Sequence, residues 1–428
     1  MTRSWWARTR GVGATIVLVG AIATGTTVAT TSAGAVSNAW TRQPLLQAPS
    51  PTAGDQFGTK TSISQDGATI VVGAPGANAA AGAAVVYVNT GGTWTFQATL
   101  VPTDPVVGDR FGSALAVSAD GSTVAVGAPD KAVLGRKASG AFYVFNRTGT
   151  AWSQTAELTP TWVSTQNHFG ASLSISTVGT QVGVGAPGRN WGLTKRAGTA
   201  YMYRRIKKVW QLTATVPPPN PVPDGKFGSS VIVKEELFLV AQPGDPSGGI
   251  VNIFDRASGP YVHETDFVAP DVQPGDGFGS AMALTEATVV VGAPHHVTGT
   301  GGEGAVYRFT HNDNTNVWTY RNQFTAANGA AGDEFGSAVS LALNTLAIGA
   351  PGRDAGSAFA FGAVYPYHLT GSTWTASGEI DAPHDPGSRH TGFGSAVGAS
   401  GPTIVAGEPK YAVGGAKTAG VAEVFADV

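Results

Sequence analysis

The stretch FGSALAVSADGSTVAVGAP at residues 111–129 decides the fold, because it recurs along the chain at nearly constant spacing. It opens with Phe-Gly and ends with Gly-Ala-Pro. In-phase Phe-Gly pairs are 54, 58, 58, 51, 57 and 58 residues apart, and they begin at Phe57, Phe111, Phe169, Phe227, Phe278, Phe335 and Phe393. Gly-Ala-Pro follows each pair, with two variants, Ala241-Gln242-Pro243 and Gly407-Glu408-Pro409. A fixed period of this length predicts a repeat architecture.

Each unit contains four strand signals, as the second unit illustrates. Residues 111–118 alternate large and small side chains and end at Asp120-Gly121, a hairpin signal. Further strand signals follow at residues 123–127, 141–145 and 152–158. Four short antiparallel strands per repeat are typical of a propeller blade. The sequence therefore predicts an all-β fold, a seven-bladed β-propeller that spans residues 36–428 as a single domain.

The two ends of the chain are predicted to close the ring. Only six fourth-strand aromatics occur, at Trp94, Trp152, Trp210, Tyr261, Trp318 and Trp374, and the last repeat ends after its third strand. The missing partner lies at the other end, because residues 39–46 match residues 93–100. We expect this N-terminal segment to supply the outer strand of the last blade, which removes an open sheet edge.

These motifs resemble the FG-GAP repeat of the integrin α-chain N-terminal propeller and of many secreted microbial proteins. The resemblance covers roughly residues 40–428. It implies a recognition module, since in integrins the face that carries the long loops binds ligand. It also implies calcium in Asp-rich hairpins between Phe-Gly and Gly-Ala-Pro.

The corresponding hairpins depart from that family pattern. Calcium takes six to eight oxygen ligands, but none of these seven hairpins holds more than two carboxylates. Asp66 and Asp120 are interpreted as ordinary turn residues. The sequence therefore predicts no calcium site of the family type, and we expect no metal and no cofactor.

Residues 1–35 have the features of a signal peptide. A basic start precedes an apolar run from Val12 to Ala23, and Ala33-Gly34-Ala35 offers small residues for cleavage. An uncleaved anchor is the alternative, because residues 11–41 carry no charge, although Thr and Gly dilute the second half of the run. Secretion is the favoured interpretation, with no stable membrane insertion after cleavage.

The composition of the chain excludes some classes of ligand and of chemistry. Without the three arginines of the leader, 23 basic and 28 acidic residues leave a net charge near −5, which argues against nucleic acid. The chain has no cysteine, which excludes thiol catalysis and Cys-ligated zinc, and it is long enough to bury a core without disulfides. We expect a monomer that binds an extracellular glycan or protein ligand.

Acidic residues recur two positions before Phe-Gly, and they could form a ring of ligands on one face. The alternative is that each caps backbone N–H groups of the turn that leads into the inner strand. Recurrence in most blades favours capping, because a functional site usually breaks the repeat. These residues are Asp55, Asp109, Asp276 and Asp333, with Asn167 in the third repeat.

The irregular loops are the better candidates for a ligand site. Loops that join second to third strands, and fourth to first, share one face of the ring, which we call the loop-rich face. An exposed Trp beside basic groups suits a sugar or an acidic peptide, although any long loop collects polar residues. The predicted ligand-binding residues, centred on Trp191, are Lys131, Arg136, Lys137, Arg189, Trp191, Lys195, Arg196, His295, His296 and Tyr411.

Catalysis has little support in the sequence, and no catalytic residue is predicted. Nucleophile elbows, His-Glu-x-x-His and phosphate loops are missing. Adjacent histidines on a loop favour a surface pair over a metal site, and His384, Asp385 and His390 are no better supported.

Two function classes stay open. The first is a secreted non-catalytic binding or adhesion module. The alternative is an extracellular polysaccharide-acting hydrolase or lyase at the channel mouth. A deep pocket with paired carboxylates, or with a carboxylate and a histidine, would favour the enzyme, whereas a shallow surface with Trp191 exposed would favour binding.

Overall fold

The computed structural model describes residues 40–256, 259–299, 301–312, 315, 317–354, 361–382 and 391–427. The predicted signal peptide, residues 1–35, lies outside them, as do His384, Asp385 and His390. From residue 38 onward the chain forms one compact unit. Among the described residues the one helical element is α1 (Ala77–Ala80), a short turn in the first blade.

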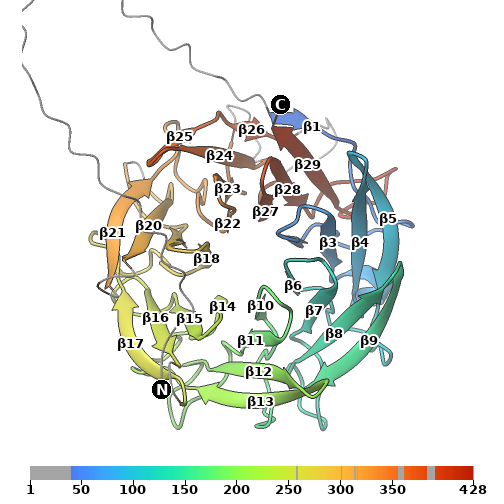
Figure 1. Cartoon of the computed structure of the whole chain (residues 1–428), viewed down its shortest axis with the longest axis horizontal. Helices are drawn as coiled ribbons and strands as arrows, with labels where there is room; N and C mark the ends of the chain where they lie inside the picture. The colour runs from blue at the N-terminus through green and yellow to red at the C-terminus, as the bar shows by residue number, and fades with distance from the viewer. Residues whose placement is uncertain are drawn as a thin grey trace, which may run out of the picture. The chain divides into compact units, whose positions relative to one another are not determined.

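The strands form seven antiparallel sheets arranged in a ring around a central opening (Figure 1), which confirms the predicted propeller. From the centre outward, blade 1 consists of β2 (Lys60–Ile63), β3 (Thr69–Ala74), β4 (Ala83–Thr90) and β5 (Thr93–Leu100). Blade 2 consists of β6 (Ala114–Val117), β7 (Thr123–Ala128), β8 (Ala141–Thr148) and β9 (Ala151–Leu158). Blade 3 consists of β10 (Ser172–Ile175), β11 (Gln181–Gly185), β12 (Ala200–Ile206) and β13 (Val209–Val216). Blade 4 consists of β14 (Val231–Lys234), β15 (Leu237–Gln242), β16 (Ile250–Asp255) and β17 (Val262–Phe267). Blade 5 consists of β18 (Ala281–Leu284), β19 (Thr288–Ala293), β20 (Ala305–Asn312) and β21 (Val317–Phe324). Blade 6 consists of β22 (Ala338–Leu341), β23 (Thr345–Ala350), β24 (Ala363–Thr370) and β25 (Thr373–Ala376), and a short strand, β26 (Ile380–Asp381), also pairs with β24. Blade 7 is β27 (Ala396–Ser400), β28 (Thr403–Glu408), β29 (Val421–Asp427) and β1 (Trp40–Arg42).

Blade 7 takes its outer strand from the other end of the chain, as predicted. In the register of β1 and β29, Trp40 lies opposite Asp427 (Figure 1). Contact continues beyond the strand, because Leu46 and Ala422 exchange backbone hydrogen bonds of 2.9 and 3.0 Å. The strand is shorter than the predicted residues 39–46, since Pro44 has no N–H to donate to the ladder.

The Phe-Gly pairs lie in turns rather than in strands, which corrects the predicted start of the inner strands. In blade 2 the strand begins at Ala114, while Phe111 forms a bridge to Gly82 of blade 1. Gly112 has φ +94°, and a Cβ there would lie 2.3 Å from the carbonyl oxygen of Ala83. The glycine is needed because the turn presses against the neighbouring blade.

The core lies between blades. One cluster joins Val71 and Val86 of blade 1 to Phe111 and Tyr143 of blade 2, and all seven Phe side chains of the Phe-Gly pairs are fully buried. Full burial of one such side chain contributes roughly 1.5–3 kcal/mol. Because each cluster needs two neighbours, stability depends on the ring being complete.

The acidic residues before Phe-Gly cap the turns, as the recurrence argument predicted. A carboxylate oxygen of Asp55 accepts from the N–H of Thr52 at 2.7 Å, and Asp276 and Asp333 make the equivalent bonds at 2.7 and 2.8 Å. All three carboxylates are buried. They hold the backbone of the turn that leads into the inner strand.

Candidate functional site

The loops between second and third strands of blades 2 and 3 fold into matching tight hairpins. Residues 133–136 and 191–194 each close a two-residue tip through paired backbone hydrogen bonds of 2.9–3.2 Å. The tips are Leu134-Gly135 and Gly192-Leu193. Leu134 is 87% exposed and Leu193 102%, so both leucines project from the loop-rich face without packing on it. Blade 7 has the same hairpin with a Gly414-Gly415 tip.

Two exposed cations follow each leucine tip, namely Arg136 and Lys137 in blade 2 and Lys195 and Arg196 in blade 3. Their backbone is fixed, since the carbonyl oxygens of Lys137 and Lys195 each accept an N–H of the following loop at 3.0 Å. Arg196 forms an ion pair with Asp224. The other three make no ion pair with any residue that the structure describes, so their charge is available to a ligand.

Further apolar side chains beside these hairpins were missed by the sequence analysis. Trp162 is 64% exposed, and Val106 and Val107 are also exposed. They lie in the loops that lead from a fourth strand into blades 3 and 2. The blade 2 hairpin hydrogen-bonds to the loop that carries Trp162, through Gln166 N to Lys137 O at 3.0 Å, whereas the blade 3 hairpin bonds to the loop that leads into blade 4, through Asp224 N to Lys195 O at 3.0 Å. We call the two leucine tips, the four cations that follow them and Trp162 the tip surface.

Trp191 lies at the base of the blade 3 hairpin and is half-buried. The guanidinium carbon of Arg189 is 5.3 Å from its ring centroid and 5.8 Å from that of Tyr201. Arg189 Nη1 also donates to the Tyr201 hydroxyl at 2.8 Å. Arg189 thus packs within its own blade, and Trp191 offers a ligand only part of its ring.

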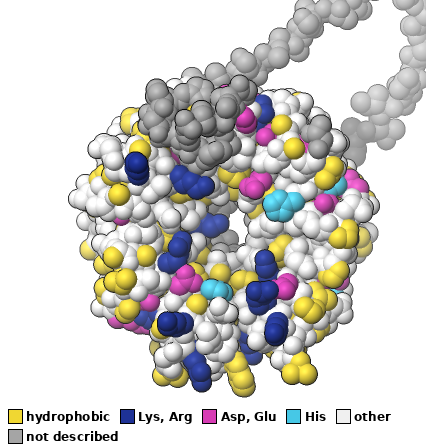
Figure 2. All heavy atoms as spheres, turned by 180° about the vertical axis from the view of Figure 1, so that it is seen from behind, with side chains coloured by type: hydrophobic (Ala, Val, Ile, Leu, Met, Phe, Trp, Pro, Cys, Tyr) yellow, Lys and Arg dark blue, Asp and Glu magenta, His cyan; other side chains and the backbone are white. Residues whose placement is uncertain are grey.

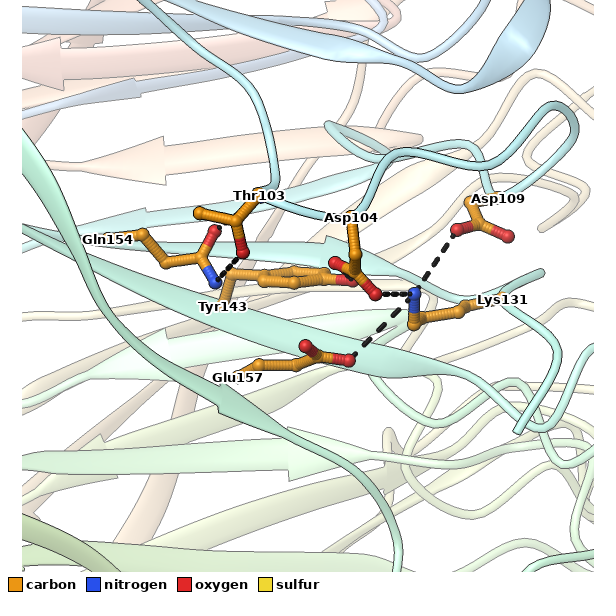
Figure 3. A network of polar contacts seen from close by, with 7 residues as sticks. All are labelled: Thr103, Asp104, Asp109, Lys131, Tyr143, Gln154 and Glu157. Atoms are coloured by element: carbon orange, nitrogen blue, oxygen red, sulfur yellow. Dashed lines mark hydrogen bonds and ion pairs between the residues drawn. The ribbon is translucent and has the colours of Figure 1, made fainter. Parts of the chain in front are cut away.

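Lys131 has a different place from the one predicted. It is buried, and its Nζ lies 2.6 Å from Asp104, 3.5 Å from Asp109 and 3.8 Å from Glu157 (Figure 3). Burial alone would lower the pKa of Lys131, but the contacts with Asp104 and Tyr143 outweigh it and raise the pKa. The buried amine neutralises the buried Asp109 and pairs with the partly exposed Asp104 and Glu157, so it is not exposed to a ligand.

The same construction occurs in blades 5 and 6. His296 Nδ1 lies 2.7 Å from Asp276 Oδ2, and Arg353 lies 3.6 Å from Asp333 and 2.8 Å from Glu379. In each blade the basic residue stands two residues after the proline of Gly-Ala-Pro, and its acidic partner two residues before Phe-Gly. His296, like Lys131, is therefore buried in a polar network that ties two loops together.

His295 and Tyr411 belong to blades 5 and 7, away from the hairpins of blades 2 and 3. His295 is exposed and Tyr411 is half-buried. The structure thus brings together Arg136, Lys137, Trp191, Lys195 and Arg196 on neighbouring blades, and it does not add the other predicted residues to that group.

A histidine and a carboxylate meet on the loop-rich face at the boundary of blades 2 and 3. His168 Nδ1 lies 3.1 Å from Asp130 Oδ1, and Arg110 Nε lies 3.7 Å from the other oxygen of Asp130. All three side chains are about one-third exposed or more. None of the three is among the predicted ligand-binding residues.

The aspartates of the first hairpins act as turn residues, as predicted. Asp120 accepts from the Ser122 N–H at 3.0 Å and from the Ser118 hydroxyl at 2.6 Å. Partial burial would raise the pKa of Asp120, but these hydrogen bonds outweigh it and lower the pKa. Across the described ranges no three His, Asp or Glu side chains are grouped to hold a metal.

A groove of about 440 Å³ lies between blades 3 and 4, and neither leucine tip lines it. Its walls include Pro217, Pro219, Phe254, Tyr261 and His263. It contains no carboxylate among its lining residues, so it lacks the acid pair or acid–histidine pair that hydrolysis of a polysaccharide requires.

Positive charge gathers around the opening of the ring. Figure 2 shows Lys and Arg side chains around the central opening on one face, with fewer Asp and Glu among them. A cluster of one sign raises the local concentration of oppositely charged ligands.

Comparison with known families gives the repeat its name. The FG-GAP repeat family matches residues 40–88, 94–145, 261–309 and 318–367, each segment running from a fourth strand into the next blade. The fold is a β-propeller, and four of its segments match the FG-GAP repeat. The blade 3 hairpin lies outside the four matched segments.

Among solved structures, the propeller is similar to the crystal structure of the RRP9 WD40 repeats, with a TM-score of 0.57 and 12% identity over 90% of this chain and 96% of that one. Identity this low shows a shared fold alone. No curated protein sequence matches the chain. None of the described helices has the length and apolar character needed to cross a bilayer.

Proposed function

We propose that this FG-GAP propeller is a secreted, non-catalytic binding module that takes an acidic extracellular protein on the tip surface of blades 2 and 3. The observation that carries the proposal is the pair of neighbouring hairpins, each with a fully exposed leucine followed by two exposed cations. Residues 1–35 would direct export, and the mature chain would act as a monomer.

The leucines favour a protein over a sugar as the ligand. Burying two leucine side chains supplies roughly 3–6 kcal/mol before the costs of association, and sugars have little apolar surface to match them. The flanking cations favour acidic groups around an apolar patch on the partner. Because the hairpin backbones are held by hydrogen bonds to neighbouring loops, little ordering cost is expected on binding.

The alternative function, a polysaccharide hydrolase or lyase, has one supporting observation, the contact of His168 with Asp130 at 3.1 Å. That carboxylate also contacts Arg110. Glycoside hydrolysis generally uses two carboxyl groups that flank the scissile bond, and this contact supplies one. The geometry therefore supports binding better than catalysis.

An array of extracellular proteins and of acidic and neutral glycans, probed with the exported protein, tests the proposal. We expect salt-sensitive binding to acidic proteins, weakened at least about tenfold, or about 1.4 kcal/mol, by the double change Leu134→Ser and Leu193→Ser. Lys417→Gln, on the equivalent blade 7 hairpin with a glycine tip, is the matched control and should bind as the unchanged protein.

Other outcomes would redirect the assignment. Binding confined to glycans, or to vesicles of anionic lipid, would show that the ligand is not a protein. Trp191→Ala separates contact from packing, since loss of affinity at unchanged melting temperature indicates contact, whereas loss of stability alone indicates that the ring packs within blade 3.

A further inference from the structure

Lys60 is the one large side chain at its position in the repeat. It stands three residues after Phe57 and begins β2, the innermost strand of blade 1. The other blades have alanine or serine there, at Ala114, Ser172, Ser230, Ala281, Ala338 and Ala396. A departure from the repeat at a single position is where a specific function is expected.

Lys60 is an exposed residue, and yet protein surrounds it on several sides. The residue is exposed, although β2 contacts inner strands of both neighbouring blades and pairs with β3 on its outer side. Its open side is therefore the channel and the face at which the strand begins. Desolvation lowers the pKa of Lys60, and the amine makes no ion pair within the described part of the chain.

Three further basic groups occupy one equivalent position around the same mouth. Arg110, His168 and Lys226 each directly precede a Phe-Gly pair, with left-handed φ of 57°, 51° and 55°. The N–H of each bonds to the loop of the previous blade at 2.9–3.0 Å, so the three side chains start from matching backbone positions of blades 2, 3 and 4. Blades 5 and 7 have glycine there and blade 6 has Glu334.

Arg110 links these three basic residues to the turn that precedes Lys60. Its Nη2 lies 3.3 Å from the amide oxygen of Gln56, and Gln56 closes the turn into β2, with Thr59 N donating to Gln56 O at 3.2 Å. Asp130, between Arg110 and His168, is the acid that these two groups contact. Two cations, Lys60 and Lys226, add charge that Asp130 does not balance.

We propose that the channel mouth over blades 1 and 2 is a binding site for a small oxyanion, a phosphate or carboxylate group held by Lys60 and Arg110. An oxyanion supplies the acceptors that the ammonium of Lys60 lacks, and guanidinium groups bind such anions through paired N–H donors. The site is separate from the tip surface, so it holds or fails independently of the proposed protein ligand.

Chemical labelling of the whole exported protein tests the site. Pyridoxal phosphate has an aldehyde that forms an imine with a neutral amine, with loss of water, and borohydride then reduces the imine to a stable amine that mass spectrometry locates. At neutral pH we expect Lys60 to be labelled about fivefold more than Lys207 and Lys208, which lie in an exposed hairpin of blade 3. Inorganic phosphate should protect Lys60, and pyridoxal, which lacks the phosphate, should label it less.

Two variants keep the test interpretable. Lys60→Ala introduces the residue of four other blades and should abolish the phosphate-protected label without changing the melting temperature. Arg110→Gln should leave Lys60 reactive but weaken phosphate protection about tenfold. Labelling of Lys60 at the level of Lys207, or equal labelling by pyridoxal without protection by phosphate, would overturn the site.

Discussion

Blade 2 and blade 7 place buried charge in opposite ways. In blade 2 the cation Lys131 comes from the loop after Gly-Ala-Pro, and Tyr143 occupies the third strand. In blade 7 the third strand has Glu423 at the position of that tyrosine, Glu408 replaces the alanine of Gly-Ala-Pro, and the cation is Arg42 on the closing strand, 3.1 Å from Glu423. The cation of blade 7 thus belongs to the opposite end of the chain. Because Arg42 lies on the closing strand, its ion pair with Glu423 forms only when the two ends of the chain meet in blade 7.

The two buried glutamates give blade 7 a second distinction. Both are fully buried, and apart from the Arg42 guanidinium beside Glu423 no described group approaches their four oxygens with hydrogen-bond geometry. Burial raises the pKa of Glu408 to about 8 and that of Glu423 to about 7. One proton shared between the two carboxyl groups supplies a donor, and Arg42 then balances the remaining charge.

Removing the closing strand should have the largest effect. Deletion of residues 36–47 exposes the edge of β29 and leaves Glu423 without Arg42. Loss of one partner of a buried ion pair alone costs roughly 3–5 kcal/mol, and an unpaired edge promotes association. We expect a lower melting temperature and aggregates in light scattering after size exclusion. A monomeric product with unchanged melting would contradict the closure.

Blade 2 should show the next largest effect when its internal cation is lost. Lys131→Met keeps the length of the side chain but leaves Asp109 and its neighbours without a counter-ion, and we expect a loss of roughly 2–4 kcal/mol in urea unfolding. Lys137→Met, six residues along and exposed, is the control and should change stability by less than about 0.5 kcal/mol. Equal losses would mean that Lys131 is not a structural cation.

Lys131 and Lys137 also show which features of the site could be predicted from the sequence and which could not. Periodicity predicted the blades and the closure, because every repeat reports the same pattern. It could not separate Lys131 from Lys137, or His296 from His295, since burial within one loop depends on the path of the backbone. A signal was present in the spacing, because Lys131, His296 and Arg353 each stand two residues after proline, in repeats whose Phe-Gly is preceded by aspartate. The leucine tips gave no signal, because exposure of an apolar residue contradicts the pattern from which burial is predicted.

The pH dependence of stability should report on the glutamate pair of blade 7. The folded pKa values of Glu408 and Glu423, about 8 and about 7, lie above the ordinary value of 4.5. The folded state therefore retains protons that the unfolded state releases, and stability contributed by the pair is complete below about pH 4.5 and is lost as the pH rises to about 8. We expect a decline on the order of a few kcal/mol across this window. The double change Glu408→Gln and Glu423→Gln should flatten it, whereas Lys137→Met, at an exposed lysine, should leave its slope unchanged.

Calcium should have the smallest effect on the melting temperature. Its addition tests whether the glutamate pair of blade 7 holds a proton or a metal ion. The first hairpins offer at most two carboxylates each, and Asp120 uses its oxygens on its own turn. Glu408 and Glu423 are the remaining buried acids without donors, but Arg42 already balances one charge there, which makes a divalent ion unfavourable. Since a ligand that binds only the folded state raises its stability by mass action, melts at neutral pH in EDTA and in millimolar calcium should coincide. An upward shift with calcium would contradict this. If Glu423→Gln removed the shift, the metal would lie in blade 7, and if the shift persisted, it would lie in the hairpins.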